Sequence, residues 1–181
     1  MKNKLLAMLM VISLAGGIGS TTVYAKDNNS VNRSNQILVQ AEDFTSSDFM
    51  VQVEELILTK VNEERRKSGL IELNLNSTMK EYARIKSQDM GRNKYFNHTD
   101  LYGNLISDKM KEDGIRYSAW GENIAYISGI SNVEDLANKF MENWMNSEGH
   151  KKNILSKNFT SIGIGVYKIG NEVYATQEFL R

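Results

Sequence analysis

The chain contains no cysteine, no proline and only two histidines among its 181 residues. Without cysteine, disulfide bonds and thiol catalysis are excluded, and so is a lipid attached to an N-terminal cysteine. Without proline, slow prolyl isomerisation should not complicate refolding. The formal net charge is zero, so nothing in the composition points to a basic surface for nucleic acid or anionic lipid.

Residues 1–25 have the layout of a secretory signal peptide. Lys2 and Lys4 precede an apolar run from Leu5 to Leu14, and Val23-Tyr24-Ala25 forms a small-x-small cleavage site. The alternative is a membrane anchor, but spanning about 30 Å of hydrocarbon takes roughly 20 apolar residues. We therefore expect a secreted protein without stable membrane insertion, whose mature chain carries a net charge of about −2 after two lysines are removed.

The mature chain divides into a polar segment and one compact domain. Residues 26–47 are rich in Asn, Ser, Asp and Gln and lack sustained periodicity, which predicts a linker. Within it, Ile37-Leu38-Val39 could form a short strand or a docking segment. Residues 48–181 suffice for one domain that buries roughly 68–70% of its unfolded surface. We expect no second domain, no internal repeat and no wall-sorting tail after the last strand.

Two helices are predicted in the first half of the domain. One starts near Asp48 and stops at Gly69, and the next starts at Asn76 or Ser77 and ends near Gly91. Their inward positions follow helical spacing; they are Val53, Leu56, Ile57 and Val61 in the first helix, and Met79, Tyr82, Ala83, Lys86 and Met90 in the second.

Two more helices follow. A short one is expected over residues 104–113, closed by Gly114. The clearest helix follows Ser131, where Ser131-Asn132-Val133-Glu134 has the pattern of a capping box. Its apolar stripe leads to the segment 147–150, and the stripe consists of Val133, Leu136, Ala137, Phe140 and Trp144.

Strands are predicted mainly at the end of the chain. Residues 123–127 form one, and the alternating runs 161–168 and 172–179 form an antiparallel hairpin around Gly170-Asn171. Gly163 and Gly165 leave one face of their strand bare, so another element should pack close there. Helices first and strands last predict an α+β domain with a small, mainly antiparallel sheet covered by helices.

Three polar side chains are the candidates for a site: His98, Glu122 and His150. Two imidazoles and a carboxylate are ligands that zinc favours when one position stays open. Each residue also has an ordinary reading. His98 could be a surface or capping residue, His150 could interact with the negative end of a helix, and Glu122 could be an exposed strand-edge carboxylate. No local ligand motif such as HExxH is present.

Other polar or aromatic positions have simpler readings. Trp144 on its helical stripe is read as a core residue, and the segment Asn62 to Arg65 as a solvated helix face. Ser147 with His150 and Glu122 could be imagined as a nucleophile triad. Nothing places Ser147 on a strained turn of the G-x-S-x-G kind, so this reading is not favoured.

Taken together, these segments resemble the CAP superfamily, which includes cysteine-rich secretory proteins, venom antigen 5 and plant pathogenesis-related class 1 proteins. The likeness is to its cysteine-free bacterial secreted branch and covers residues 51–181. The motifs are weak singly but specific in this order; they are Asn62-x-x-Arg65, Phe96-x-His98, Gly121-Glu122-Asn123, Trp144-x-x-Ser147-x-Gly149-His150-x-x-Asn153, and Ile162-Gly163-Ile164-Gly165-Val166.

The resemblance implies a three-layer α-β-α sandwich with a cleft that can bind zinc or another divalent cation. His98, Glu122 and His150 look like three of the family's four cleft residues. Ser147 stands where the fourth, a glutamate, is often found, with Glu148 and Glu142 as possible substitutes. The remaining motif residues are expected to support the cleft; they are Asn62, Arg65, Asn123, Trp144, Ser147 and Asn153.

Two functional classes remain open at this point. The favoured one is a non-catalytic extracellular binding module for a lipid, glycan or peptide. The alternative is a metal-dependent, peptidase-like hydrolase acting on cell-wall or protein substrates, in which a metal-bound water is activated. The missing fourth ligand favours the first, because the sequence shows no oxyanion stabiliser and no clear general base. The natural ligand and the oligomeric state are not indicated.

Overall fold

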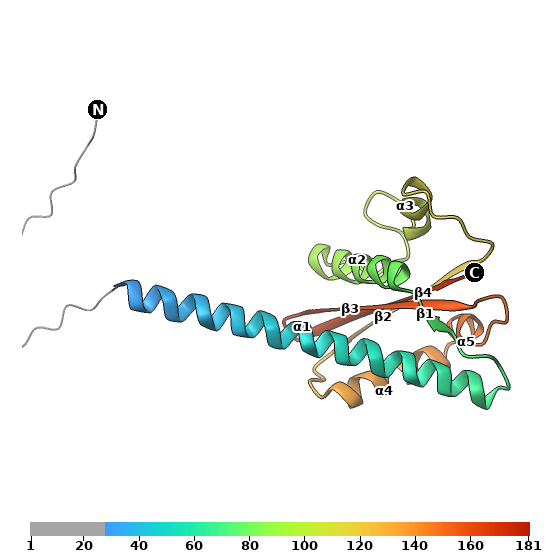
Figure 1. The fold of residues 1–181 in the computed structure, drawn as a ribbon, viewed down its shortest axis with the longest axis horizontal. Coiled ribbons are helices and arrows are strands. Elements are labelled where there is room, and N and C mark those ends of the chain that lie inside the picture. Colours follow the sequence, from blue (N-terminus) through green and yellow to red (C-terminus); the bar gives the residue numbers. More distant parts are fainter. Residues whose placement is uncertain (1–27) are drawn as a thin grey trace, which may run out of the picture. The chain divides into compact units, whose positions relative to one another are not determined.

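The computed structural model describes residues 28–181, with side chains from residue 47 onward. Residues 38–181 form one compact unit, and the predicted signal peptide lies outside the described residues. The elements, labelled in Figure 1, are α1 (Asn28–Lys67), β1 (Asn74–Leu75), α2 (Ser77–Asn93), α3 (Ile106–Glu112), β2 (Trp120–Ser128), α4 (Val133–Met145), α5 (Glu148–Ile154), β3 (Ser161–Ile169) and β4 (Glu172–Leu180).

Residues 28–47 are helical and belong to α1. The short strand considered at Ile37-Leu38-Val39 is therefore wrong, whereas the reading of residues 26–47 as a polar linker stays a prediction. The physical reason lies in what the segment does not contain. From Lys26 to Lys67 there is neither glycine nor proline, so no residue interrupts the helix even though its composition is polar.

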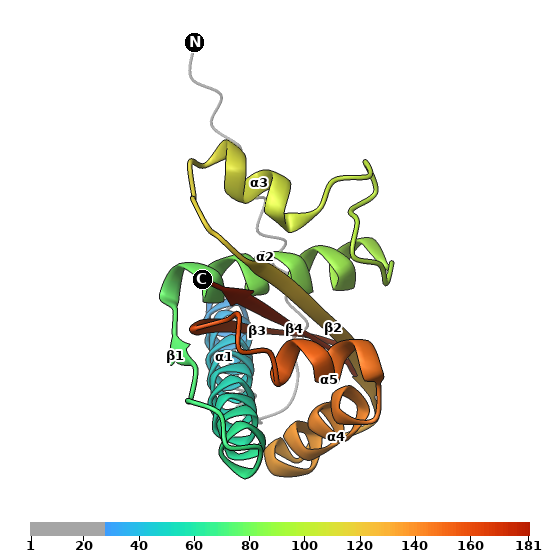
Figure 2. The same cartoon turned by 90° about the vertical axis from the view of Figure 1, so that its right-hand side faces the viewer.

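The sheet has four strands in the order β1-β3-β4-β2. β4 pairs antiparallel with both β3 and β2, whereas the two-residue β1 pairs parallel with β3. Helices cover both faces: α2 and α3 lie on one side, and α1, α4 and α5 on the other (Figures 1 and 2). The predicted α+β sandwich with a mainly antiparallel sheet is confirmed. β1 was not predicted, because two residues are too short to show a periodicity.

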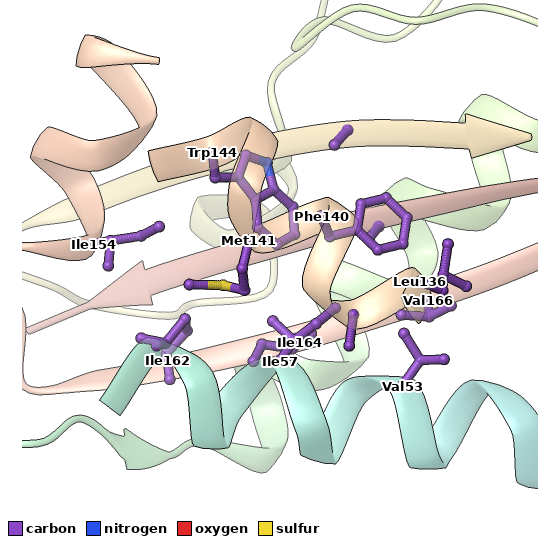
Figure 3. Close-up of a cluster of buried hydrophobic side chains, with 14 of the residues drawn as sticks. Val53, Ile57, Leu136, Phe140, Met141, Trp144, Ile154, Ile162, Ile164 and Val166 are labelled. Atoms are coloured by element: carbon purple, nitrogen blue, oxygen red, sulfur yellow. The ribbon is translucent and has the colours of Figure 1, made fainter. Parts of the chain in front are cut away.

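The main core lies between the sheet and the helices α1 and α4 (Figure 3). Its aromatic centre is Trp144 stacked on Phe140, with ring centroids 5.5 Å apart. Both side chains are fully buried, as the predicted stripe requires. The aliphatic partners come from α1 and β3; they are Val53, Ile57, Ile162, Ile164 and Val166.

On the other face, α2 lies directly against the two strand glycines. A Cβ on Gly163 would come within 2.0 Å of the Met79 carbonyl carbon, and one on Gly165 within 2.1 Å of the Arg84 nitrogen. Both of these contacts are with helix backbone, which cannot move aside. The close approach predicted at the bare strand face is therefore confirmed, and the approaching element is α2.

Asparagine side chains cap two of the helices. Asn76 accepts a hydrogen bond from the Met79 N–H at 3.1 Å, as expected for α2. Asn132 accepts one from the Asp135 N–H at 3.0 Å and so caps α4. The predicted capping box from Ser131 to Glu134 is thus wrong by one residue: asparagine is as good a cap as serine, and Glu134 instead faces Lys60 at 3.6 Å.

Candidate functional site

The loop after α2 brings His98 to the edge strand β2. His98 Nδ1 lies 2.5 Å from Glu122 Oε1. The His98 side chain is 49% exposed and that of Glu122 only 2%, so the imidazole covers a buried carboxylate. These two predicted site residues therefore meet, although 24 positions separate them in the chain.

Lys86 anchors the loop that carries His98. Its ammonium reaches from the buried face of α2 and donates to the His98 carbonyl oxygen at 2.7 Å and to the Tyr95 hydroxyl at 3.3 Å. Burial lowers the pKa of Lys86. The charges of nearby carboxylates, that of Glu122 foremost, partly offset this lowering. The sequence placed Lys86 on the inward face of the helix but gave no sign of this role.

Asp100 stabilises the far end of the same loop. Its Oδ1 accepts hydrogen bonds from the backbone N–H groups of Tyr102 and Asn104, each at 2.8 Å. These bonds, that of Asn104 foremost, lower the pKa of Asp100. The loop is thus a closed turn with defined hydrogen bonds, and His98 is held from both sides.

His150 lies in the first turn of α5, not at the end of α4 as its sequence position suggested. α4 ends at Met145 and a new helix begins at Glu148. The proposed interaction with a helix C-terminus is therefore wrong. Burial, followed by the charge of His98, lowers the pKa of His150. His150 Nδ1 is buried and has no hydrogen-bond partner among the described residues.

A network of buried amides joins α5 to the sheet. Asn153 Nδ2 donates to the Glu122 carbonyl oxygen at 3.2 Å and to Asn123 Oδ1 at 2.8 Å. Asn123 Nδ2 donates to the His150 carbonyl oxygen at 3.1 Å and to Gln177 Oε1 at 2.9 Å. Both asparagines therefore hold the backbone that presents Glu122 and His150, as their motif positions suggested.

A fourth ionisable residue of the site is Glu178 in β4, which the sequence reasoning missed. It is the cross-strand partner of Glu122 and is fully buried. Trp120 Nε1 donates to Glu178 Oε2 at 2.7 Å. Burial, followed by the charge of Glu122 and a hydrogen bond with it, raises the pKa of Glu178 well above its usual range. The sequence did carry one signal for this residue: Glu178 is a charged residue inside the last predicted strand, residues 172–179.

The two glutamates considered as substitutes do not complete the site. Glu142 and Glu148 are both exposed, and Glu142 accepts a hydrogen bond from Lys139 at 2.8 Å. Ser147 is the N-cap residue of α5, but its side chain makes no capping hydrogen bond. The buried carboxyl next to Glu122 is that of Glu178, contributed by a different element from the one considered.

The described residues contain no preformed metal-binding group, so the predicted metal centre stays a prediction. Two imidazoles and a carboxylate suit zinc by their chemistry, and His150 Nδ1 and Glu122 Oε2 are buried without partners. However, His98 Nδ1 and Glu122 Oε1 bind each other. Across residues 28–181, no group of three or more His, Cys, Asp or Glu side chains could hold an ion. No step through a metal is therefore derived.

The remaining motif residues have structural roles. Trp144 is buried and donates from Nε1 to the Ile124 carbonyl oxygen at 3.3 Å, so its core reading is confirmed. Asn62 and Arg65 are buried, and their reading as a solvated face is wrong. Asn62 exchanges two hydrogen bonds with the Leu73 backbone. Arg65 donates to three carbonyl oxygens, those of Ile71, Ile154 and Ser156.

A cavity of about 500 Å³ lies between α2 and α3, beside the His98 loop. Its wall carries charges of both signs: Lys86 and Asp89 come from α2, and Lys109 and Glu112 from α3. No aromatic side chain lines this cavity.

A search of the described helices finds none with the length and hydrophobicity needed to cross a membrane.

These features define a class: a mixed four-stranded sheet between helical layers, with a His–Glu pair at its edge strand. Residues 58–179 match the cysteine-rich secretory protein family, CAP. The chain therefore belongs to this family, as its motifs indicated.

Known relatives agree with the assignment. The chain is 38% identical over 163 residues to the uncharacterized Bacillus subtilis protein YkwD, covering 89% of this chain and 60% of YkwD. It is similar to the structure of an extracellular SCP-domain protein from Bacillus anthracis, with 30% identity, a TM-score of 0.59, and 75% of this chain and 41% of that chain covered.

An outer surface protein of Borrelia burgdorferi shares the fold, with 22% identity, a TM-score of 0.62, and 71% of this chain and 92% of that chain covered.

The chain spans less than two thirds of the length of each of the two Bacillus relatives named above.

Proposed function

We propose that this protein is a secreted, non-catalytic CAP domain that binds a short extracellular peptide in the cavity between α2 and α3. The observation that carries the proposal is the cavity itself, about 500 Å³ in volume and walled by both cationic and anionic side chains. Ligand sites for small molecules are commonly pockets of this size. A peptide matches such a wall because it presents an ammonium, a carboxylate and hydrogen-bonding amides.

The character of the wall favours a peptide over the other ligand classes considered. A lipid tail needs a continuous apolar lining, whereas charged side chains interrupt the apolar residues of this wall, Ile85, Leu105 and Ile106. A sugar ring is commonly held against an aromatic face, and no aromatic residue lines the cavity. Charged groups in a partly enclosed site favour a ligand that carries complementary charges.

The cavity and the His98 site share residues, and Lys86 is the cationic one. Lys86 lines the cavity and also donates to the His98 carbonyl oxygen. A ligand carboxylate that attracts the Lys86 ammonium would therefore act on the loop that carries His98. This link supports a single binding region on the α2 face of the sheet.

Binding is favoured over hydrolysis because the reactive groups are engaged with each other. Glu122, the best placed base, is almost fully buried and paired with His98. The described residues provide no preformed metal group, so the metal-dependent hydrolase would need the site to rearrange first. A general base must be within reach of the proton it removes, and a buried, occupied carboxylate does not meet this requirement.

Secretion is part of the proposal. The layout of residues 1–25 supports export, and the Bacillus anthracis neighbour is described as an extracellular protein. A zero count of cysteine is compatible with export, because a domain of this size can rely on its core.

The test is a ligand titration of the uniformly ¹⁵N-labelled protein, followed by amide NMR. Tripeptides with mixed charges should shift resonances of α2 and α3 residues around the cavity, whereas oligosaccharides and fatty acids should not. Ile85→Trp, which adds bulk to the cavity wall, should weaken peptide binding at least about tenfold, equivalent to about 1.4 kcal/mol. The matched control is Ile71→Trp, at an isoleucine that is 89% exposed and outside this cavity.

Two outcomes would contradict the proposal. One is equal peptide affinity in Ile85→Trp and Ile71→Trp; the other is binding of the oligosaccharide or fatty acid alone. Calorimetric titration with Zn²⁺ addresses the metal prediction in parallel. A saturable heat at neutral pH that disappears in both His98→Ala and His150→Ala would support the metal centre, because His150 Nδ1 and Glu122 Oε2 have no partner among the described residues. Zinc binding that is unchanged in both variants would contradict it.

A further inference from the structure

A second cavity, of about 410 Å³, lies where the C-terminal end of α1, the strand β1 and the segment before β3 meet (Figure 1). It shares no wall residue with the cavity between α2 and α3. Its volume lies in the range that is common for small-ligand sites. A ligand of this cavity is therefore recognised by a separate set of side chains.

One part of the wall is apolar. Phe159 is buried, Leu70 is partly buried, and Ile71 at the rim is 89% exposed. A large apolar side chain left in water is unfavourable, and a ligand that covers it lowers the free energy. This part of the wall suits an apolar group on the ligand.

Arg65 gives the wall a buried positive charge. The residue is 2% exposed, and its Nε and Nη1 donate to the carbonyl oxygens of Ile71, Ile154 and Ser156. These bonds join the loops and the end of α5, so a structural role accounts for two of the three guanidinium nitrogens. The third, Nη2, makes no hydrogen bond within residues 47–181. It is not one of the sealed polar atoms that lack a partner, so it is open to the cavity that Arg65 lines.

No carboxylate of residues 47–181 neutralises this charge. Arg65 forms no ion pair there, and Glu72, the acidic residue of the wall, is paired with Arg66. Burial lowers the pKa of Arg65, the direction expected for a charge without a counter-charge. Lys157, an exposed residue of the same wall, adds a second positive charge. Buried charges are usually paired, so the wall is complementary to an anion.

We propose that this cavity binds a small carboxylate that carries an apolar group. The carboxylate accepts from Arg65 Nη2 and is attracted by Lys157, while the apolar group lies against Leu70, Ile71 and Phe159. One free guanidinium nitrogen suits the single charge of a carboxylate better than a phosphate, whose oxygens need more donors. A free aliphatic acid and the C-terminal residue of a peptide both have this chemistry.

The experiment is a titration of the ¹⁵N-labelled secreted protein with hexanoate, followed by NMR of backbone amides and arginine side chains. Hexanoate should shift the amides of residues 69–72 and 157–160 and the guanidinium signals of Arg65. Hexanamide has the same chain without the charge and should bind at least about tenfold more weakly. Acetate and inorganic phosphate lack the apolar chain and should also bind at least about tenfold more weakly.

Two lysine variants test the rim without disturbing the bonds of Arg65. Lys157→Glu should weaken hexanoate binding at least about threefold, a modest loss because the pair is exposed. The matched control is Lys152→Glu, at an exposed lysine of α5 outside this wall, which should bind like the wild type. Ile85→Trp should also leave hexanoate binding unchanged, which separates this site from the cavity between α2 and α3.

N-acetylleucine, which resembles the last residue of a peptide, distinguishes the two sources. Binding at least as tight as that of hexanoate would assign the site to a peptide terminus, and weaker binding would assign it to a free acid. Equal affinity for hexanoate and hexanamide, or no hexanoate shifts at residues 69–72 and 157–160, would overturn the proposal. So would equal losses in Lys157→Glu and Lys152→Glu.

Discussion

The two faces of the sheet differ in where the large apolar cluster and the buried ionisable groups of the site lie. The face under α1 and α4 is closed by Phe140, Trp144 and aliphatic side chains. The face under α2 contains buried ionisable groups, Lys86, Glu122 and Glu178, alongside small apolar clusters. An apolar layer stabilises by removing surface from water, whereas buried charges add little and must be matched to one another. The comparison suggests that one face holds the domain together while the other holds the site.

The largest expected effect comes from opening the apolar face. Phe140→Ala removes a fully buried ring stacked on Trp144 and should lower the free energy of unfolding by about 3–5 kcal/mol. The control is Phe96→Ala on the other face, where the ring is 48% exposed and the loss should stay below about 1.5 kcal/mol. Urea denaturation measures both. Similar losses would mean that the two faces contribute alike.

The next effect tests how tightly α2 is packed against the sheet. Gly165→Ala places a Cβ about 2.1 Å from helix backbone, so strand or helix must shift, at a cost of about 3 kcal/mol. Gly149→Ala is the matched control: nothing lies within 4 Å of its Cβ, and alanine should be neutral or stabilising by up to about 1 kcal/mol in α5. Thermal unfolding compares the two variants. Equal melting temperatures for Gly165→Ala and Gly149→Ala would contradict the close packing of α2 on the sheet.

A smaller effect concerns the pH dependence of the polar face. Burial raises the folded-state pKa of Glu178, while the unfolded chain has a pKa near about 4.3. Between the two values the folded state keeps a proton that the unfolded state releases, so rising pH destabilises the wild type. Relative to it, Glu178→Gln should gain up to about 1.4 kcal/mol per pH unit within that window. Parallel urea stability curves between pH 5 and pH 8 would contradict this expectation.

The smallest effect sharpens a detail of the apolar face, the start of α4. Asn132→Ala removes the side chain that accepts from the Asp135 N–H and should cost about 1 kcal/mol. Ser131→Ala should change stability by less than about 0.5 kcal/mol, since no capping bond comes from that residue. A larger loss for Ser131 than for Asn132, measured by urea denaturation, would reinstate the capping box predicted from sequence.

Much of the fold was predictable because its signals are local. The Asn76 cap, the apolar stripe ending at Trp144 and the hairpin around residues 170–171 each depend on neighbouring residues alone. The errors were also local in origin. A short strand was considered in a polar segment that has no helix breaker, and serine was preferred to asparagine as a cap one position too early. β1 escaped because two residues carry no pattern.

The site was only partly predictable. The motifs named His98 and Glu122, and the structure pairs them. They did not reveal that Lys86 holds the loop or that Arg65 is buried as a clamp. Both roles consist of hydrogen bonds to carbonyl oxygens of distant segments, and nothing in the identity of a lysine or arginine states which carbonyl it will meet.

The sequence by itself determined the class of fold, the helix and strand periods, the need for glycine at 163 and 165, and membership of the CAP family. Only the tertiary structure decided that the second carboxyl of the site is Glu178 and that His150 lies in the first turn of a new helix. The physical reason is strand register: pairing between β2 and β4 makes residues 122 and 178 neighbours, and that pairing follows from how the whole sheet packs between its helices.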